Sequence, residues 1–484
     1  MTTIKLDPGA ALLLDALHGA GHAAYAVGGC VRDSLLGLAP HDWDLCTSAR
    51  PEQVMALFGE EKCIPTGLQH GTVTVKQGGR LYETTTFRTE GAYSDGRHPD
   101  AVCFVPDVRE DLARRDFTIN AMAYSAEEGL IDPFGGRDDL AAHLVRAVGE
   151  PERRFAEDAL RILRLYRFAA RFGFAIDPAT GAAARALGPH LDCVSAERIQ
   201  EELLKLLAAP RPGSYLEPAV LAVVVPELEP EKQPERFAEL CRIIDRIEPT
   251  AENVPTRLAA LLCPLGEAGA RKALRKLKCS NALTDEVTAL EREAGGGAGS
   301  FLLGHEFELR HPADALCLER HSHPAGRCPN SNSLFPPQAA VVAVAGHSIA
   351  RPIACGNRVP PQRTVLGETP GTPNTTLTVQ AKRLLGRYEL PTIKRLTALC
   401  SARHPEQAEA FAALRAEAER LTAENACCRV SQLAVNGRDL MAAGVRPGPG
   451  LRQVLNALLE AVITGQTPNE KDALLAAAAQ FSAS

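Results

Sequence analysis

Two aspartates one residue apart, in the stretch "HDWDL", are the residues of this chain best suited to metal chemistry. Alternate residues of an extended strand face the same side, so a strand here would present Asp42 and Asp44 to one point. Carboxylate oxygens suit Mg²⁺, which also takes substrate phosphates as ligands. The spacing predicts a Mg²⁺ site at these two residues, and the plainer alternative is a loop with two solvated aspartates.

A glycine pair lies just upstream, in "YAVGGCVRDSLL". The first residues alternate like a strand and the last have helical spacing, which places Gly28 and Gly29 at a strand-to-helix turn. Backbone N–H groups at a helix N-terminus can approach an anion where no side chain intervenes, and Arg32 can add a charge-assisted contact. Neither a GxGxxG nor a GxxxxGK[ST] motif is present, which argues against dinucleotide and P-loop sites.

An arginine pair in "DLARRDFTINAMAY" comes ahead of a predicted helical start. In an enzyme that uses triphosphates, one of Arg114 and Arg115 would neutralise charge on the departing pyrophosphate. The commoner alternative is a surface ion pair with the neighbouring Asp116.

The stretch "EDALRILRLYR" places an aspartate and three arginines at three-residue intervals of a predicted helix: Asp158, Arg161, Arg164 and Arg167. Asp158 and Arg161 then share a face, and such a pair is most often a simple salt bridge. The functional alternative is recognition of a base. A carboxylate accepts from the amino group of cytosine or adenine while a guanidinium donates to ring acceptors, and the carbonyl of guanine or uracil would be rejected.

The surrounding pattern indicates an α+β head followed by all-α regions. Short β-like runs with Gly, Asp and Pro punctuation fill the N-terminal part, and apolar residues at helical spacing dominate after it. The expected organisation is a catalytic head at residues 1–148, a helical neck and body at 149–293, an irregular or inserted segment at 294–376 and a helical tail at 377–484.

The composition is that of an ordinary globular protein, with 45% apolar residues and a net charge of -6. The chain as a whole is not basic, so its net charge does not indicate nucleic-acid binding. An RNA site would have to be a local basic patch, for which the candidates are "RKALRKLK" (271–278) and "AKRLLGRY" (381–388). The 14 cysteines show no regular spacing, which is typical of reduced thiols and favours the cytoplasm. No run is long and apolar enough for a membrane helix.

Together these motifs resemble the bacterial tRNA nucleotidyltransferases, the CCA-adding enzymes, of the class shared with bacterial poly(A) polymerases in the polymerase beta superfamily. The resemblance is clear over residues 22–210 and returns in the C-terminal region. It implies template-independent addition of C, C and A to the 3' end of tRNA from CTP and ATP, with pyrophosphate released. The partners implied are tRNA, CTP and ATP, with neither membrane nor DNA, and recognition of tRNA shape is expected over sequence.

The resemblance also assigns roles to individual residues. It implies that Asp42 and Asp44 hold the metal, with Glu83 as a weaker third candidate. The implied nucleotide-binding residues are Gly28, Gly29, Arg32 and Arg115 for the triphosphate and Asp158, Arg161, Arg164 and Arg167 for the base. A poly(A) polymerase or an enzyme adding only CC or only A would keep every motif, and a non-catalytic RNA-binding protein is the alternative from another class.

Overall fold

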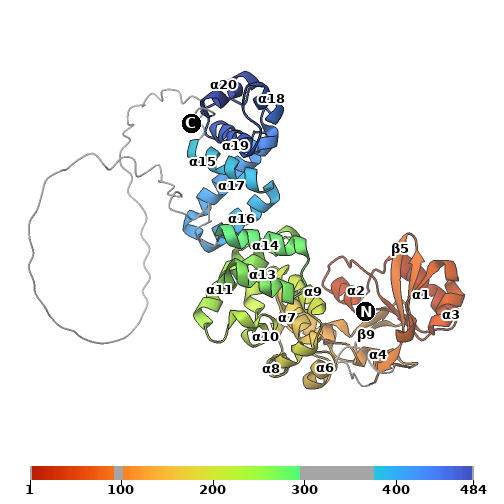
Figure 1. Ribbon diagram of the computed structural model, residues 1–484. Coiled ribbons are helices and arrows are strands. Elements are labelled where there is room, and N and C mark those ends of the chain that lie inside the picture. The colour runs from red at the N-terminus through yellow and green to blue at the C-terminus, as the bar shows by residue number, and fades with distance from the viewer. Residues whose placement is uncertain (1–2, 92–101, 295–374, 482–484) are drawn as a thin grey trace, which may run out of the picture.

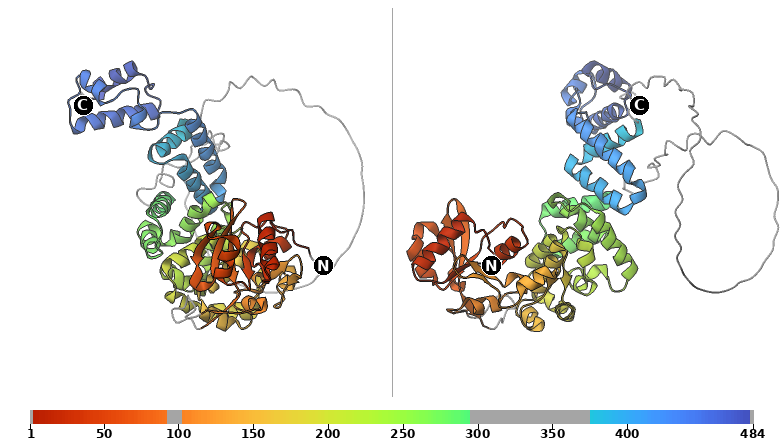
Figure 2. Two further views of the ribbon diagram at one scale, coloured as in Figure 1. Left: turned by 90° about the vertical axis from the view of Figure 1, so that its right-hand side faces the viewer. Right: turned by 180° about the vertical axis from the view of Figure 1, so that it is seen from behind.

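The computed structural model describes residues 3–91, 102–294 and 375–481 (Figure 1). A head of sheet and helices stands at one end, and a succession of helices leads away from it to the C-terminal region at the other end (Figures 1 and 2). The predicted α+β head followed by all-α regions is confirmed. The irregular segment predicted for 294–376 lies outside the described residues except at its ends, where Ala294 ends one helix and Thr375 begins another.

The head is built on a seven-stranded mixed sheet with the strand order β3-β4-β5-β2-β1-β8-β9. The β-like runs predicted for the N-terminal part are present as strands. The strands are β1 (Ala24–Val27), β2 (Leu45–Thr47), β3 (Cys63–Gly67), β4 (Thr72–Gln77), β5 (Arg80–Thr86), β6 (Arg88–Glu90), β7 (Val102–Phe104), β8 (Ala123–Ser125), β9 (Gly129–Ile131), β10 (Leu144–Val145) and β11 (Ala175–Ile176).

Strand β1 is buried on both faces, which explains its unbroken run of apolar residues. Ala24 and Ala26 belong to the main core of the chain, whereas Tyr25 and Val27 belong to a second, smaller core on the other face. The head helices are α1 (Pro8–Gly19), α2 (Gly29–Leu35), α3 (Pro51–Phe58), α4 (Val108–Ala113) and α5 (Gly136–Ala141). Because β1 is held between two cores, the turn that follows it has a fixed position.

The rest of the described chain is helical. After the head come α6 (Pro151–Glu157), α7 (Leu160–Phe172), α8 (Pro178–Ala186), α9 (Ala196–Leu207), α10 (Pro218–Val224), α11 (Pro234–Arg246), α12 (Val254–Leu262), α13 (Gly266–Lys276) and α14 (Asn281–Ala294). The last helices are α15 (Thr375–Arg387), α16 (Leu390–Arg403), α17 (Ala408–Ala423), α18 (Gly437–Ala442), α19 (Pro449–Ile463) and α20 (Lys471–Phe481). The main core continues from the head to α17, and α18 to α20 surround a core of their own.

A fully buried arginine joins three of these helices. Arg257 on α12 donates to the carbonyl oxygens of Leu207, Ala209, Pro210 and Ile247, at 2.5 to 3.4 Å. These carbonyls lie at or just beyond the C-terminal ends of α9 and α11, where helices leave acceptors without intrahelical partners. The guanidinium charge thus meets the negative ends of two helices, and no carboxylate is needed to bury it.

Candidate functional site

The predicted strand-to-helix turn is present between β1 and α2. Gly28 is the residue before the helix and has a φ of 75°, a backbone conformation that favours glycine. Its own N–H donates to the Met122 carbonyl oxygen at 3.0 Å, so Gly28 shapes the turn. The first amides of α2, beginning with Gly29, lack intrahelical partners and are the donors that remain for an anion.

Arg115 lies directly over this turn. A Cβ at Gly28 would come within 2.9 Å of the Arg115 Nη1 atom, so a side chain at that position would displace the guanidinium. Arg115 Nη2 is 3.3 Å from Asp111 Oδ2, and its buried Nε has no hydrogen-bond partner among the described residues. The pairing with Asp116, raised as an alternative, is not what holds Arg115. A cation with spare donors therefore faces the glycine turn.

The arginine pair precedes only a single short 3-10 helix, followed by a strand. Arg114 caps the C-terminal end of α4, and the 3-10 helix Thr118–Asn120 and strand β8 follow. The apolar run after the pair belongs to a buried strand next to β1, because "NAMAY" supplies residues to both cores. Arg115 is thereby fixed next to β1 by the sheet and not by a helix start.

Asp42 and Asp44 lie on an extended segment just before β2, and the expectation that they are part of a strand was wrong. The alternation nevertheless holds, because both aspartates are exposed while Trp43 between them is buried in the core. The Val27 N–H donates to the Asp44 carbonyl oxygen at 3.0 Å, which joins this segment to the residue before the glycine turn. The two carboxylates thus lie beside the turn on one side of their segment.

The Asp44 side chain is open to solvent on one side but is otherwise surrounded by protein atoms and charges. Partial desolvation raises the pKa of its carboxyl group, and the charges of Glu83 and Asp42 raise it further, while Arg115 opposes them. Glu83 lies on β5, which pairs in parallel with β2. Within the part of the chain that the structure describes, no cluster of three or more His, Cys, Asp or Glu side chains is arranged to hold a metal ion. A pair of carboxylates such as Asp42 and Asp44 fits Mg²⁺ chemically, because that ion commonly uses one or two protein carboxylates with substrate phosphates.

Arg32 is buried beside the turn, with 3% of its surface exposed. Its Nε donates to Asp33 at 2.7 Å, its Nη1 donates to Asn120, and its guanidinium lies 4.8 Å from the centre of the Phe172 ring. Its Nη2 is 3.6 Å from the position a Cβ on Gly29 would take. Arg32 therefore places a buried cation behind the turn, between the head and α7.

The predicted single helix around Asp158 is broken, which corrects the expectation that Asp158 and Arg161 share a helical face. Helix α6 ends at Glu157 and α7 begins at Leu160, with Asp158 in an extended conformation between them. The break is stabilised locally, because Asp158 Oδ1 accepts the Leu160 N–H at 3.1 Å. The Asp158 carboxylate is held by Arg198 of α9, whose two terminal nitrogens donate to its two oxygens at 3.3 and 2.8 Å.

The three α7 arginines predicted to contact the base each have a partner within the protein. Arg161 donates to Glu157 at 2.8 Å and to the carbonyl oxygens of Arg154 and Arg114 at 3.1 Å. Arg164 donates twice to one Asp116 oxygen, at 2.9 and 2.6 Å, and Arg167 donates to Glu202 at 2.5 Å. Since Asn120 bonds both Asp116 and Arg32, the contacts of Arg164 continue through the head to the glycine turn.

Helix α9 supplies two residues that the sequence interpretation missed, Arg198 and Glu202. A signal for one of them was present, because Glu202 falls on the apolar face of its helix and is only 5% exposed. A carboxylate is almost never buried without a partner, so its position predicts a cation opposite. Arg198 lies one turn earlier on the same helix, but the residues around it in the sequence do not indicate that it is buried or paired.

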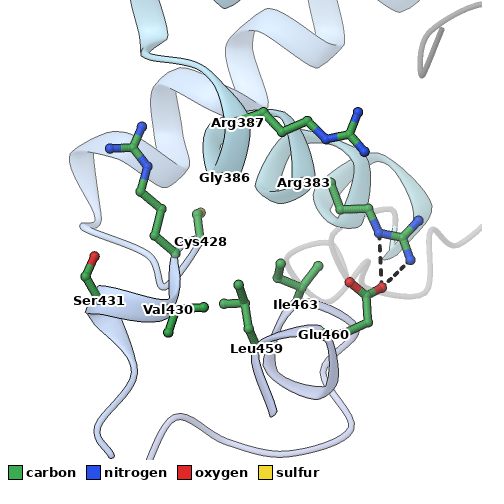
Figure 3. A pocket seen from close by; sticks show the side chains of 10 residues that line it. Arg383, Gly386, Arg387, Cys428, Val430, Ser431, Leu459, Glu460 and Ile463 are labelled. Atoms are coloured by element: carbon green, nitrogen blue, oxygen red, sulfur yellow. Dashed lines mark hydrogen bonds and ion pairs between the residues drawn. The ribbon is translucent and has the colours of Figure 1, made fainter. Parts of the chain in front are cut away.

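A cavity of about 750 Å³ lies in the tail between α15, α19 and the segment after α17. Figure 3 shows Arg383 and Arg387 of α15 beside it, with Val430, Leu459 and Ile463 along an apolar side. Arg429, from the segment after α17, also lines the cavity. Arg383 pairs with Glu460 across the cavity wall. Arg383 and Arg387 belong to the predicted basic stretch at 381–388, which is therefore exposed to a cavity and not only to open solvent.

Three family profiles match the chain. A profile described as "Poly A polymerase head domain" matches residues 24–146, and one described as "Probable RNA and SrmB- binding site of polymerase A" matches residues 173–230. A third, for a tRNA nucleotidyltransferase domain 2, matches residues 382–478. The first spans the glycine turn, both aspartates and Arg115, and the third spans the arginine-lined cavity of the tail.

A CCA-adding enzyme of Limosilactobacillus fermentum is 33% identical over 97% of this chain and 96% of its own length. The chain belongs to the CCA-adding enzyme family. Another member, from Lactobacillus helveticus, is 43% identical over 57% of this chain and 68% of its own length. The crystal structure of the Bacillus stearothermophilus CCA-adding enzyme in complex with CTP superposes with a TM-score of 0.68, at 29% identity and 98% coverage of both chains.

CCA-adding enzymes are nucleotidyltransferases, and nucleotidyltransferases of the polymerase beta type are metal-dependent in general. The resemblance first drawn from the motifs is thereby confirmed. The structure of a Thermotoga maritima CCA-adding enzyme with tRNA shares the fold, with a TM-score of 0.58 at 18% identity. Among the described residues, no helix is long and apolar enough to cross a membrane.

Proposed function

We propose that the protein adds C, C and A in turn to the 3' end of tRNA, using CTP and ATP and without a nucleic-acid template. The observation that carries the proposal is the meeting of three features at one place: the glycine turn, the Asp42 and Asp44 pair, and the Arg115 guanidinium over Gly28. Full-length similarity to a CCA-adding enzyme supports the choice of product.

The amides that begin α2 and the guanidinium of Arg115 bind the triphosphate in this proposal. The Nη1 atom of Arg115 lies over the turn, whereas the contact of this guanidinium with Asp111 is made through Nη2. Asp42 and Asp44 hold Mg²⁺, which when bound supplies Lewis-acid stabilisation of charge at the reacting phosphate. The 3'-hydroxyl oxygen of the RNA attacks the α-phosphorus, the new P–O bond forms, and pyrophosphate leaves as the old bond breaks.

Asp158 and Arg161 read the base, and their spare hydrogen-bonding capacity supports this role. A carboxylate offers about four acceptor positions, of which Arg198 and the Leu160 N–H occupy three at Asp158. One lone pair on Oδ2 is left to accept an exocyclic amino group of cytosine or adenine. Arg161 uses three of its five N–H groups within the protein, and the other two can donate to the base.

Arg164 and Arg167 assist by holding α7, the helix that carries Arg161, in place. Arg164 joins it to Asp116 of the head, and Arg167 joins it to Glu202 of α9. Because both contacts are charge-assisted and largely buried, they fix the helix on two sides. Arg32 has the same positioning role from the other side of the turn, through Asp33 and Asn120.

The domain organisation proposed is a catalytic head at 1–148, a neck and body at 149–293 that selects the nucleotide, and a tail at 377–484 that binds tRNA. The arginine-lined tail cavity supports the last assignment, because guanidinium groups beside an apolar wall suit an RNA backbone with its sugars. Substituting Gln for Arg383 and Arg387 together should weaken binding of full-length tRNA, and should leave binding of a short acceptor-stem RNA unchanged.

The test of the proposed activity supplies Mg²⁺ and tRNAs that end before the CCA, after C and after CC. CTP and ATP are given separately and together, and the 3' ends are sequenced. Addition that stops at CCA supports the proposal, whereas A-tails of variable length, CC-only or A-only products assign a sister activity. No extension under any divalent ion indicates a binding protein, and Asp44→Asn serves as the inactive control. Chelation followed by addition of Mg²⁺, Mn²⁺ or Ca²⁺ tests the choice of metal.

A further inference from the structure

A second cavity, of about 400 Å³, lies at the C-terminal end of α7, the end opposite Arg161. It is lined from α7 by Arg171 and Phe172, and from the segment after α9 by Arg211, Ser214 and Tyr215. Arg161 and Phe172 are eleven residues apart on one helix, which at about 1.5 Å per residue separates them by about 16 Å. The cavity is therefore distinct from the site assigned to the incoming base.

The walls of the cavity are preformed. Helix α7 ends at Gly173 with a φ of 68°, which turns the chain away and leaves Phe172 at the edge. Across from it, the Gly213 N–H and the Ser214 hydroxyl both donate to Asp245 of α11, at 2.7 and 3.1 Å. A Cβ at Gly213 would lie 2.1 Å from the Cys241 carbonyl oxygen, so this wall packs against α11 with no space for a side chain.

Two aromatic rings and a cation without a partner give the cavity its chemistry. Phe172 and Tyr215 are half-buried, so each combines a fixed position with an accessible surface. Arg211 is exposed and forms no ion pair or hydrogen bond within the described part of the chain. Arg171 is held by Asp33 at 3.3 Å and lies over the Phe172 ring at 5.0 Å, which leaves Arg211 as the uncommitted charge.

We propose that this cavity binds one unpaired nucleotide of the RNA substrate, upstream of its reacting 3' end, a proposal that rests on the proposed function. The base stacks on the Tyr215 ring and contacts the edge of the Phe172 ring, which already carries Arg32 and Arg171, and Arg211 contacts the adjoining phosphate. Aromatic platforms beside a basic side chain are the usual means of binding single-stranded RNA. The volume is within the range of sites that hold one small ligand.

Other nucleic-acid ligands fit less well. A base-paired stem cannot insert its bases between protein rings, because they are stacked within the helix. A free triphosphate would bring several negative charges to a cavity with one uncommitted guanidinium, whereas a phosphodiester brings one. The family profile for an RNA-binding site of polymerase A covers Arg211, Ser214 and Tyr215, which supports RNA as the ligand.

The cavity is also connected to the reaction site through its arginines. The Phe172 ring that lines it carries Arg32 on its surface, at 4.8 Å, and Arg32 lies behind the glycine turn. Arg171 contacts Asp33 on the same head helix. A nucleotide on Phe172 would therefore fix α7 against the head while the 3' end reacts.

The experiment uses the full chain with three variants, Tyr215→Leu, Arg211→Gln and the control Arg242→Gln. Arg242 is an exposed arginine on neighbouring α11 that pairs with Glu239, so its variant removes the same charge outside the cavity. Binding is measured without nucleotide, for tRNA ending in unpaired nucleotides and for the same RNA with the 3' end trimmed to the last base pair, across a salt series. The KM for CTP and for tRNA are measured separately.

Tyr215→Leu should weaken binding of tRNA with the unpaired end by about 5- to 150-fold, the range for loss of one stacked base. Arg211→Gln should reduce the slope of the logarithm of the RNA-binding constant against the logarithm of the salt concentration by about the contribution of one phosphate contact. Both should raise the KM for tRNA and not the KM for CTP, and neither should change binding of the trimmed RNA. The Arg242→Gln control should behave as the unaltered protein.

A photo-crosslink from 4-thiouridine, placed in the unpaired end, to the peptide containing residues 211–215 would support the proposal directly. Variants that bind both RNAs like the unaltered protein would overturn it, and would leave a protein partner as the use of this surface. An equal loss for both RNAs would also overturn it, since the contact would then be to the stem. These outcomes are separate from the proposed activity, which fails only if the unaltered protein does not extend tRNA.

Discussion

Replacing Asp116 with Asn tests the contact between the head and helix α7. The Asp116 carboxylate accepts two bonds from Arg164 at one oxygen, and bonds from Asn120 and the Phe117 N–H at the other. The amide can keep the second set, but it must either turn an N–H₂ group toward Arg164 or give up Asn120. In both cases Arg164 loses the carboxylate charge, and Glu202 at 3.9 Å is its only other anion among the described residues.

The loss in free energy of unfolding depends on how much of the Asp116–Arg164 ion pair is buried. Removing one partner of a buried ion pair costs about 3–5 kcal/mol. Asp116 is 9% exposed but the Arg164 side chain is 34% exposed, so solvent recovers part of the loss and we expect about 2–4 kcal/mol. By contrast, Glu239→Gln removes an exposed pair with Arg242 and should cost at most about 0.5 kcal/mol.

The pH dependence has a definite sign. Burial acts to raise the pKa of Asp116, but the Arg164 charge and the hydrogen bonds from Asn120 and Arg164 hold it well below its usual range. The ionised carboxylate therefore stabilises the fold above about pH 4, and this contribution is lost as the pH falls through the lowered pKa. The difference in free energy of unfolding between the unaltered protein and Asp116→Asn should be constant near neutral pH and should disappear in acid.

The assay is urea unfolding followed by tryptophan fluorescence. Trp43 is the sole tryptophan and is buried in the head, so it reports on the part that Asp116 stabilises. If Asp116→Asn unfolds within about 0.5 kcal/mol of the unaltered protein at pH 7, comparable to Glu239→Gln, the pair does not stabilise the fold in the way described. A difference that persists unchanged into strong acid would refute the assignment to an ionised carboxylate.

Three further predictions follow from other residues. Asp44→Asn should lower nucleotide incorporation by about 100-fold or more at saturating Mg²⁺, because it removes a metal ligand; an unchanged rate in a single-turnover assay would contradict the assignment. Asp158→Ala should lower kcat/KM for CTP and ATP by about 5- to 150-fold and narrow the discrimination against UTP, as measured by competition between nucleotides. Burial raises the pKa of Glu291 to about 7, so the fold loses stability as the pH rises from about 4.5 to 7. Glu291→Gln, which resembles the protonated acid, should be more stable at pH 8 by up to about 3 kcal/mol, with no gain at pH 4; circular dichroism during urea unfolding tests this.

The sequence was most informative where local periodicity and burial agree. Strand β1 and the turn at Gly28 were predictable, because an alternating run ended by glycines admits few other conformations. The break at Asp158 was not, since every residue around it has acceptable helix propensity and the cause is a side chain that bonds the Leu160 N–H and Arg198. Tertiary contact therefore overrode local preference at the residue proposed to read the base.

The site residues divide in the same way. Residue types and spacing were enough to propose Asp42 and Asp44 as metal ligands, whereas Arg115 was proposed from the family resemblance. Their partners could not be paired from one sequence, since Arg198 and Asp158 are 40 positions apart and nothing local connects them. The same limit applied to Phe172 and Tyr215, which look like ordinary core aromatics until the fold places them at one cavity.

The contacts between the head and α7 differ from those among α9, α11 and α12 in the acceptors that their arginines use. Between the head and α7, arginines meet carboxylates, so protonation in acid or screening by salt weakens these contacts. Among α9, α11 and α12, Arg257 meets only uncharged peptide carbonyls, which no accessible pH neutralises. Acid should therefore release the head while α9, α11 and α12 remain packed together, so a protease added at low pH would cut first near α6.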